Sequence, residues 1–68
     1  MKKADYGARV ERGIILLVTE HGHVVASLDR NGITTPPIQS VDGTAYSVGD
    51  IVYFFLFNDG TGKILCAK

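Results

Sequence analysis

The sequence predicts an all-β domain, a small five-stranded antiparallel barrel that follows a flexible N-terminal arm. Two observations favour this class. No window keeps apolar residues at the three-and-four spacing of a helix for more than one turn. Glycine and other turn residues recur every 8 to 12 positions, which is typical of small all-β folds. The 68 residues leave room for a single domain, which we place at residues 8–68, after an arm at residues 1–7.

The expected strands are joined by turns rich in glycine. Gly13 lies inside the first strand and suggests a bulge or a sharp bend. Asn31-Gly32 predicts a tight hairpin turn, because both of its central residues need positive φ. Pro36-Pro37 cannot donate ladder hydrogen bonds, so the third strand lies at an edge or ends early. The expected ranges are Ala8–Thr19, His23–Asp29, Ile33–Ile38, Ile51–Phe57 and Lys63–Ala67. Five such strands fit a barrel of the OB-like or SH3-like type.

The balance of charges limits what the protein can bind. Seven Lys and Arg residues offset seven Asp and Glu residues, so the formal net charge is zero. This balance disfavours electrostatic binding to nucleic acids or to anionic membrane surfaces. The single cysteine, Cys66, excludes an internal disulfide and favours a reducing compartment. No apolar segment follows Lys2 and Lys3, so we expect no signal peptide, and no run approaches the roughly 20 residues of a membrane-spanning helix.

Two of the expected strands are apolar on both faces. Alternate residues of a strand point to opposite sides of the sheet, yet both sets are hydrophobic in Ile51–Phe57 and in Ile14–Val18. No helices are expected that could cover the second side. Three explanations stay open: a bent strand shared between two parts of a coiled barrel, an outer face that self-associates, and a platform for an aromatic ligand. We favour self-association.

The outer face of the aromatic strand is the candidate functional surface. Tyr53, Phe55 and Phe57 share one face, and we expect them to mediate self-association or docking on a protein partner. Ile15 and Leu17 form an expected second patch. The aromatic side chains could instead stack single-stranded bases, as OB folds do. No cluster of cations accompanies these aromatic residues. We therefore rank single-stranded nucleic-acid binding second, as the alternative function.

The motifs that could carry chemistry are incomplete. Gly60-Thr61-Gly62-Lys63 is similar to the end of a phosphate-binding loop, but Phe57 and Ile64 stand where that loop needs glycine and Ser or Thr. We expect a glycine-rich hairpin turn there. His21 and His23 have no third ligand at metal-binding spacing, and we expect both to be solvated. Nothing in the sequence holds a base beside Cys66, which we expect to act as a small hydrophobic residue.

The positions of most acidic residues indicate roles in turns rather than in catalysis. Glu11 and Glu20 do not form a recognisable catalytic pair. A small barrel is filled by its own side chains, so we expect a non-enzymatic protein without a metal, a cofactor or a small-molecule substrate. Four aspartates beside expected turns should accept hydrogen bonds from nearby backbone amides; they are Asp29, Asp42, Asp50 and Asp59.

From Arg9 to Leu65, the order of these features resembles small OB-like barrels of the structural modules of tailed phages and prophages, found in tails, baseplates and head–tail joints. The resemblance lies in a leading valine strand, Gly22-His23-Val24-Val25-Ala26-Ser27-Leu28-Asp29, Asn31-Gly32 with Thr35-Pro36, Tyr46-Ser47-Val48-Gly49-Asp50-Ile51-Val52-Tyr53 and Asn58-Asp59-Gly60-Thr61-Gly62-Lys63-Ile64-Leu65.

This resemblance implies a non-enzymatic building block that packs against copies of itself or against neighbouring virion proteins. It implies no catalytic residues. It also implies a location in the cytoplasm of a bacterial host or in the virion. From the sequence we therefore expect a homo-oligomer or a partner of phage structural proteins.

Overall fold

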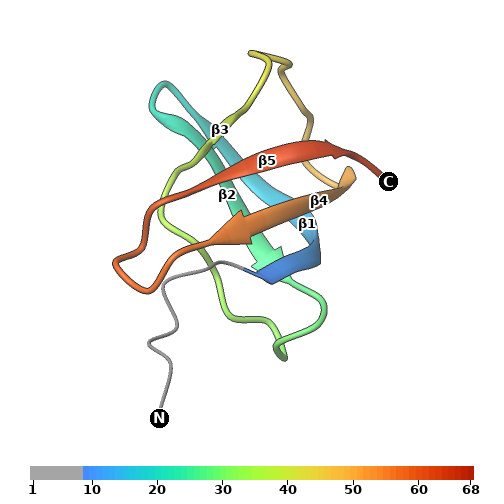
Figure 1. The fold of residues 1–68 in the computed structure, drawn as a ribbon. Helices are drawn as coiled ribbons and strands as arrows, with labels where there is room; N and C mark the ends of the chain where they lie inside the picture. Colours follow the sequence, from blue (N-terminus) through green and yellow to red (C-terminus); the bar gives the residue numbers. More distant parts are fainter. Residues whose placement is uncertain (1–8) are drawn as a thin grey trace, which may run out of the picture.

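The structure is all-β, and its strands form one curled sheet. The computed structural model describes residues 9–68, and every regular element in this range is a strand. The order across the sheet is β2-β1-β4-β5-β3, and the sheet curls into a half-barrel (Figure 1). The expected arm at residues 1–7 lies outside the described residues. The strands are β1 (Arg9–Thr19), β2 (Gly22–Ser27), β3 (Gln39–Ser40), β4 (Ile51–Leu56) and β5 (Gly62–Ala67).

The sheet is mixed, so the prediction of a purely antiparallel barrel is wrong. β1 pairs antiparallel with β2 and with β4, and β4 pairs antiparallel with β5, but β3 runs parallel to β5. No continuous ladder joins β2 to the segment that leads into β3, so the barrel is not fully closed. Two isolated antiparallel bridges connect them instead, from His23 to Ile38 and from Ala26 to Thr34.

The third strand is displaced from its predicted position. We expected Ile33–Ile38, but β3 occupies only Gln39–Ser40. Pro36-Pro37 has no backbone N–H to donate, so regular pairing begins after it. The turn predicted at Asn31-Gly32 is confirmed, with φ of 59° and 81°.

β1 bends and is shared between two parts of the sheet. Its first half pairs with β4 and its second half with β2, and the two ladders overlap at Gly13 and Ile14. A Cβ added at Gly13 would collide with the Val25 side chain and lie 2.8 Å from Cε1 of Phe54. Glycine at this position therefore allows β1 to approach β2 and β4 closely at once. A bent strand was one of the three explanations that the sequence left open for the apolar residues on both faces of β1.

The core lies inside the curl of the sheet and is small. Tyr46 and Leu56 are half-buried and pack against it. Its buried hydrophobic members are Ile15, Val25, Ile38, Val52, Phe54 and Ile64, all at most 4% exposed.

Candidate functional site

The outer face of β4 carries a row of large side chains. Val52 and Phe54 are fully buried, so they define the inner face of β4. Alternate residues point the other way, and Ile51, Tyr53 and Phe55 stay half-exposed on the outer face. This arrangement leaves an apolar surface on the outside of the half-barrel.

Neighbouring strands extend this outer face, because residues paired across strands share a side of the sheet. On β1, Val10 pairs with Phe55 and is 60% exposed. On β5, Lys63 pairs with Phe55, and the exposed Cys66 pairs with Tyr53. The apolar row on β4 is thus flanked by a further apolar side chain and by a cation.

Phe57 follows the end of β4 and continues the row. Its ring centroid lies 5.4 Å from that of Phe55, with an interplanar angle of 78°. This edge-to-face arrangement is a favoured geometry for aromatic pairs, and Phe57 still exposes 38% of its surface. We call Val10, Tyr53, Phe55 and Phe57 the aromatic patch.

The predicted second patch is wrong for Ile15, which belongs to the core. Ile15 is 1% exposed, whereas Leu17 is 53% exposed. The two side chains would share a face in a regular strand, but the register of β1 against β2 shifts between them. A bulge inserts one extra residue, here Leu16, and so changes which side chains point inward.

The bulge produces an apolar surface of its own. Leu16, Leu17 and Val18 are 46%, 53% and 46% exposed. The N–H of Gly49 donates to the backbone carbonyl of Ile15 at 2.8 Å, and this bond places the neighbouring Val48, which is 64% exposed, beside the part of β1 where the bulge begins. We call Leu16, Leu17 and Val48 the bulge patch; Val18 pairs with the inward-facing His23 and therefore points to the other side of the sheet. The sequence shows its apolar run but not the register shift that exposes three successive residues.

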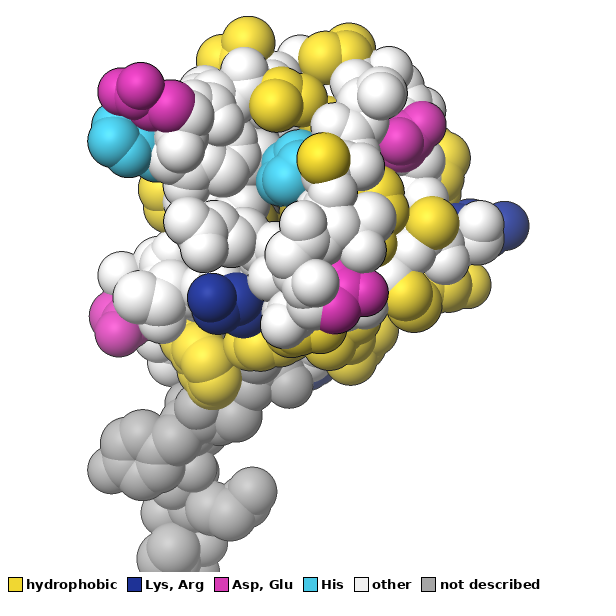
Figure 2. All heavy atoms as spheres, turned by 90° about the horizontal axis from the view of Figure 1, so that it is seen from above, with side chains coloured by type: hydrophobic (Ala, Val, Ile, Leu, Met, Phe, Trp, Pro, Cys, Tyr) yellow, Lys and Arg dark blue, Asp and Glu magenta, His cyan; other side chains and the backbone are white. Residues whose placement is uncertain are grey.

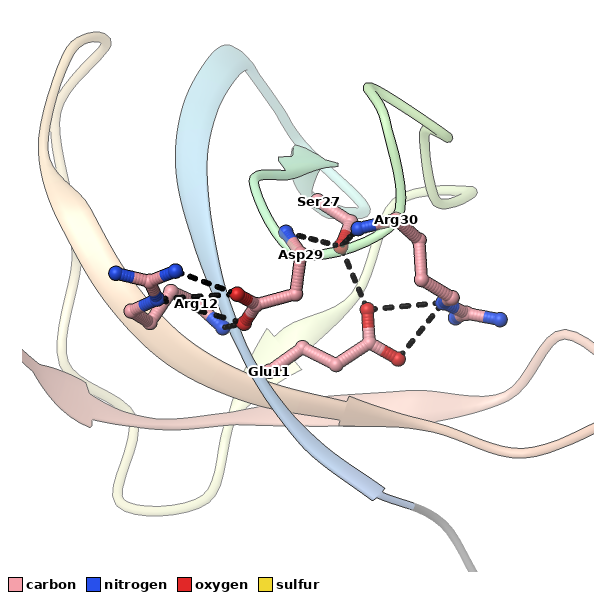
Figure 3. Close-up of polar contacts among 5 residues, drawn as sticks. All are labelled: Glu11, Arg12, Ser27, Asp29 and Arg30. Carbon is pink, nitrogen blue, oxygen red and sulfur yellow. Dashed lines mark hydrogen bonds and ion pairs between the residues drawn. The ribbon is translucent and has the colours of Figure 1, made fainter.

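A polar network fixes the segment after β2 against β1 (Figure 3). The carboxylate of Glu11, only 5% exposed, accepts hydrogen bonds from Ser27 Oγ at 2.6 Å and from Arg30 Nε at 2.9 Å. Ser27 Oγ in turn accepts from the N–H groups of Asp29 and Arg30. Sequence reasoning found no role for Glu11, although its position two residues before Gly13 could have indicated the inner face.

Arg12 and Asp29 form a second, exposed pair (Figure 3). Arg12 Nη2 donates to Asp29 Oδ1 at 2.6 Å, and the Arg12 backbone N–H donates to Oδ2 at 2.8 Å. Hydrogen bonding between the side chains raises the pKa of Arg12 and lowers the pKa of Asp29. Asp29 accepts a backbone amide as predicted, but this amide belongs to Arg12, 17 residues earlier, and not to the turn beside Asp29, because the chain after β2 folds back onto β1.

The other three aspartates bind backbone amides at turns, which confirms their predicted role. The Thr61 hydroxyl and N–H hold the pKa of Asp59 below its ordinary value, and the Thr44 N–H does the same for Asp42. The backbone bonds run from Thr44 to Asp42 at 3.0 Å, from Ser47 to Asp50 at 2.9 Å and from Thr61 to Asp59 at 2.9 Å.

The two histidines lie in different environments, and the prediction that His23 is solvated is wrong. His21 is exposed, with Nε2 3.4 Å from the Glu20 carboxylate. His23 points inward from β2 and is 7% exposed; its Nε2 accepts the Tyr46 N–H at 3.0 Å, and its Nδ1 lies 3.3 Å from the Ile38 carbonyl oxygen. Within residues 9–68, no three His, Cys, Asp or Glu side chains form a group that could hold a metal ion.

An open groove lies between the β1–β2 turn and the β4–β5 turn. It is lined by His21, by residues 36–39 and by residues 59–63, and its volume is about 530 Å³. The glycine-rich segment leads from β4 into the antiparallel β5, as predicted for a hairpin turn.

Charged side chains do not gather into one patch on the face shown in Figure 2. Acidic and basic groups are scattered there, and hydrophobic side chains reach the surface in several places between polar atoms. This face therefore lacks the continuous cationic surface that usually tracks a nucleic-acid backbone.

Comparisons with protein-family models, with curated proteins and with solved structures find no match for this chain. In the part of the chain that the structure describes, no helix is long and apolar enough to cross a membrane.

Proposed function

We propose that this chain is a non-enzymatic interaction protein that associates with copies of itself through the aromatic patch. The supporting observation is the distribution of large hydrophobic residues. Among the described residues, nine of them are exposed, whereas the buried core holds six hydrophobic side chains. Large apolar patches on soluble proteins often mark interaction surfaces.

The aromatic patch is suited to a stable contact. Phe55 and Phe57 already hold each other edge to face, so ordering them on association would cost little side-chain entropy. Val10 and Phe57 remain 60% and 38% exposed. Complete burial of a side chain of this size contributes about 1.5–3 kcal/mol relative to full exposure.

We further propose an OB-like architecture for the half-barrel. It is supported by the pairing of β1 with both β2 and β4, and by the parallel pairing of β3 with β5. A five-stranded, partly open barrel is the general description of this class. The sequence resemblance to phage structural modules would place the heterologous partners among virion proteins.

The test is the solution mass, measured by light scattering on a sizing column over a range of concentrations. The wild-type protein is expected to form a species several times 7.3 kDa. Phe55→Asp is expected to return it to the monomer, because a carboxylate would have to be desolvated in the contact. Val10→Asp tests the same patch at a more exposed position, where the substitution is less able to disturb folding.

Ile33→Asp is the matched control. Ile33 is 52% exposed and lies outside both patches, so the same change of charge should leave the mass of the assembly unaltered. A wild-type protein that stays monomeric at every concentration would overturn the proposal. So would an assembly that survives both Phe55→Asp and Val10→Asp.

Single-stranded nucleic-acid binding is the second candidate, and one observation favours it. The groove between the β1–β2 and β4–β5 turns lies where OB folds bind oligonucleotides, and Lys63 is among its lining residues. A labelled single-stranded oligonucleotide, titrated at low salt, should then bind and lose affinity steeply as salt rises. Lys63→Glu should weaken that binding. Absence of binding at low salt would exclude this function.

A further inference from the structure

We infer that His23 is a pH-sensitive switch, which holds residues 42–48 against β2 while its imidazole is neutral and releases them when it is protonated. His23 points inward from β2 and is 7% exposed. Residues 42–48 make up most of the long loop between β3 and β4 (Figure 1). This loop is fixed at its far end, where the Gly49 N–H donates to the Ile15 carbonyl. The switch would operate with or without the proposed self-association.

The two contacts of the His23 ring determine which of its nitrogens carries the proton. A backbone N–H can only donate, so Nε2, which lies 3.0 Å from the Tyr46 nitrogen, is an unprotonated acceptor. A neutral imidazole then carries its proton on Nδ1. This nitrogen lies 3.3 Å from the Ile38 carbonyl oxygen and can donate to it. The neutral ring therefore satisfies both partners at once.

Protonation of Nε2 removes the acceptor that the loop uses. Two N–H groups would then face each other across 3.0 Å, and a positive charge would lie in a site that is nearly closed to solvent. The contact of Nδ1 with Ile38 would survive, because a charged imidazole donates from both nitrogens. Imidazole is the side chain that ordinarily gains its proton between about pH 8 and pH 5. A fall in pH through this range is therefore expected to break the bond to Tyr46.

The bond from Tyr46 to His23 ties the middle of the loop to another strand. Within the loop, hydrogen bonds are local: Ser40 Oγ donates to the Thr44 carbonyl at 2.7 Å, and the Thr44 N–H donates to Asp42 at 3.0 Å. The Tyr46 N–H instead crosses to a residue 23 positions earlier in the chain. The Tyr46 side chain packs against the core, so losing this bond would loosen the loop at its point of attachment.

The titratable groups around His23 do not oppose its protonation. The Tyr46 ring, whose centroid lies 5.6 Å from that of the imidazole, is a phenol, and phenols are uncharged in this range of pH. Glu20 lines the same hollow of about 280 Å³ as His23, but its side chain is 85% exposed and its carboxylate lies 3.4 Å from His21 Nε2. Asp42 is bound by an N–H of its own loop. The rest of β2 and residues 31–40 carry no titratable side chain, and none of the described residues that line the hollow is Lys or Arg.

NMR relaxation of the backbone amides, measured from about pH 8 to about pH 5, tests the switch. At the upper end we expect order parameters near 0.85 for residues 42–48, and at the lower end values below about 0.6. The amides of β1 and β4 should keep their values, because the release is local.

Two variants assign the response to one histidine. His23→Gln offers an amide oxygen that accepts a hydrogen bond and gains no proton in this range, so the loop should stay rigid throughout the titration. His21→Gln is the matched control, since His21 is exposed and contacts Glu20 rather than the loop. This variant should respond as the wild-type protein does.

Several results would overturn the inference. One is a wild-type loop that stays rigid at the lower end of the titration. Others are a release that persists in His23→Gln or is lost in His21→Gln. Loss of order in all strands together would indicate acid unfolding of the whole protein and would equally contradict a local switch.

The imidazole itself provides a second measurement, which needs no variant if His23→Gln does not fold. Long-range ¹H–¹⁵N spectra of the wild-type protein show which ring nitrogens are protonated. Above the transition we expect a proton on Nδ1 alone, and below it on both nitrogens, with the same midpoint as the release of the loop. A proton on Nε2 of His23 at the upper end, or a different midpoint, would contradict the proposed contact.

Discussion

At the scale of single residues, Glu11 brings a carboxylate into the interior of the half-barrel. Its oxygens accept from the Ser27 hydroxyl and the Arg30 guanidinium, so the buried charge is both paired and hydrogen-bonded. Breaking such a pair on one side is costly, because the remaining charge stays buried without its partner. Arg12 and Asp29 form an equally close pair but lie in solvent, where ion pairs contribute little.

The buried pair is expected to matter more for stability than the exposed one. Arg30→Ala should lower the free energy of unfolding by about 1–3 kcal/mol, the cost of leaving a buried polar group short of a partner. Arg12→Ala should lower it less. Urea unfolding of both variants at one protein concentration and neutral pH measures the difference. Equal losses would mean that solvent reaches Glu11 in the folded protein.

At the scale of elements, β1 sets the shape of the molecule through two irregular positions. Gly13 allows the close approach of β2 and β4, and the bulge at Leu16 turns the end of the strand outward. Without the bulge, Leu17 would follow Ile15 onto the inner face. One strand therefore contributes both to the core and to the bulge patch.

The close approach at Gly13 predicts a large effect for a single methyl group. Gly13→Ala should destabilise the protein by about 1–3 kcal/mol, as overpacking a core does. Val25→Ala removes the atom that the new methyl would meet first, so the double variant should be less destabilised than the sum of the two single changes. Chemical denaturation of the four proteins measures this coupling. Strictly additive losses would show that the cost of the added methyl group does not come from its contact with Val25.

At the scale of the whole molecule, a small core coexists with a large exposed apolar surface. The half-barrel buries six hydrophobic side chains and leaves nine large ones exposed among the described residues. A chain of this size buries only about 60% of the surface that its unfolded form exposes. Association would bury more apolar surface than folding alone can.

Stability should therefore depend on protein concentration. Anything that binds only the folded state stabilises it by mass action, so the midpoint of thermal unfolding should rise with concentration. Each tenfold increase is worth about 1.4 kcal/mol per contact in the limit of full assembly. Phe55→Asp should abolish this dependence and Ile33→Asp should keep it. Scanning calorimetry over a hundredfold range of concentration is the measurement, and a midpoint independent of concentration would contradict association.

Local patterns in the sequence were sufficient to predict much of the fold. Alternation and turn residues predicted the all-β class, four strand positions to within two residues at each end, and the turn at Asn31-Gly32. They also placed Tyr53 and Phe55 on one face of β4, since strand alternation is a local property. The same reasoning predicted three of the four turn aspartates, because their partners lie within three residues.

Contacts between distant residues decided the rest. The parallel pairing of β3 with β5, the bulge at Leu16 and the burial of Glu11 and His23 each depend on a partner far along the chain. The periodicity of apolar residues along the sequence cannot reveal such partners, because it describes one strand without the strands that pair with it. The sequence by itself thus determined which segments become strands and where most turns fall. Tertiary structure decided which apolar residues fill the core and which remain on the surface, since that choice depends on register and on space between strands.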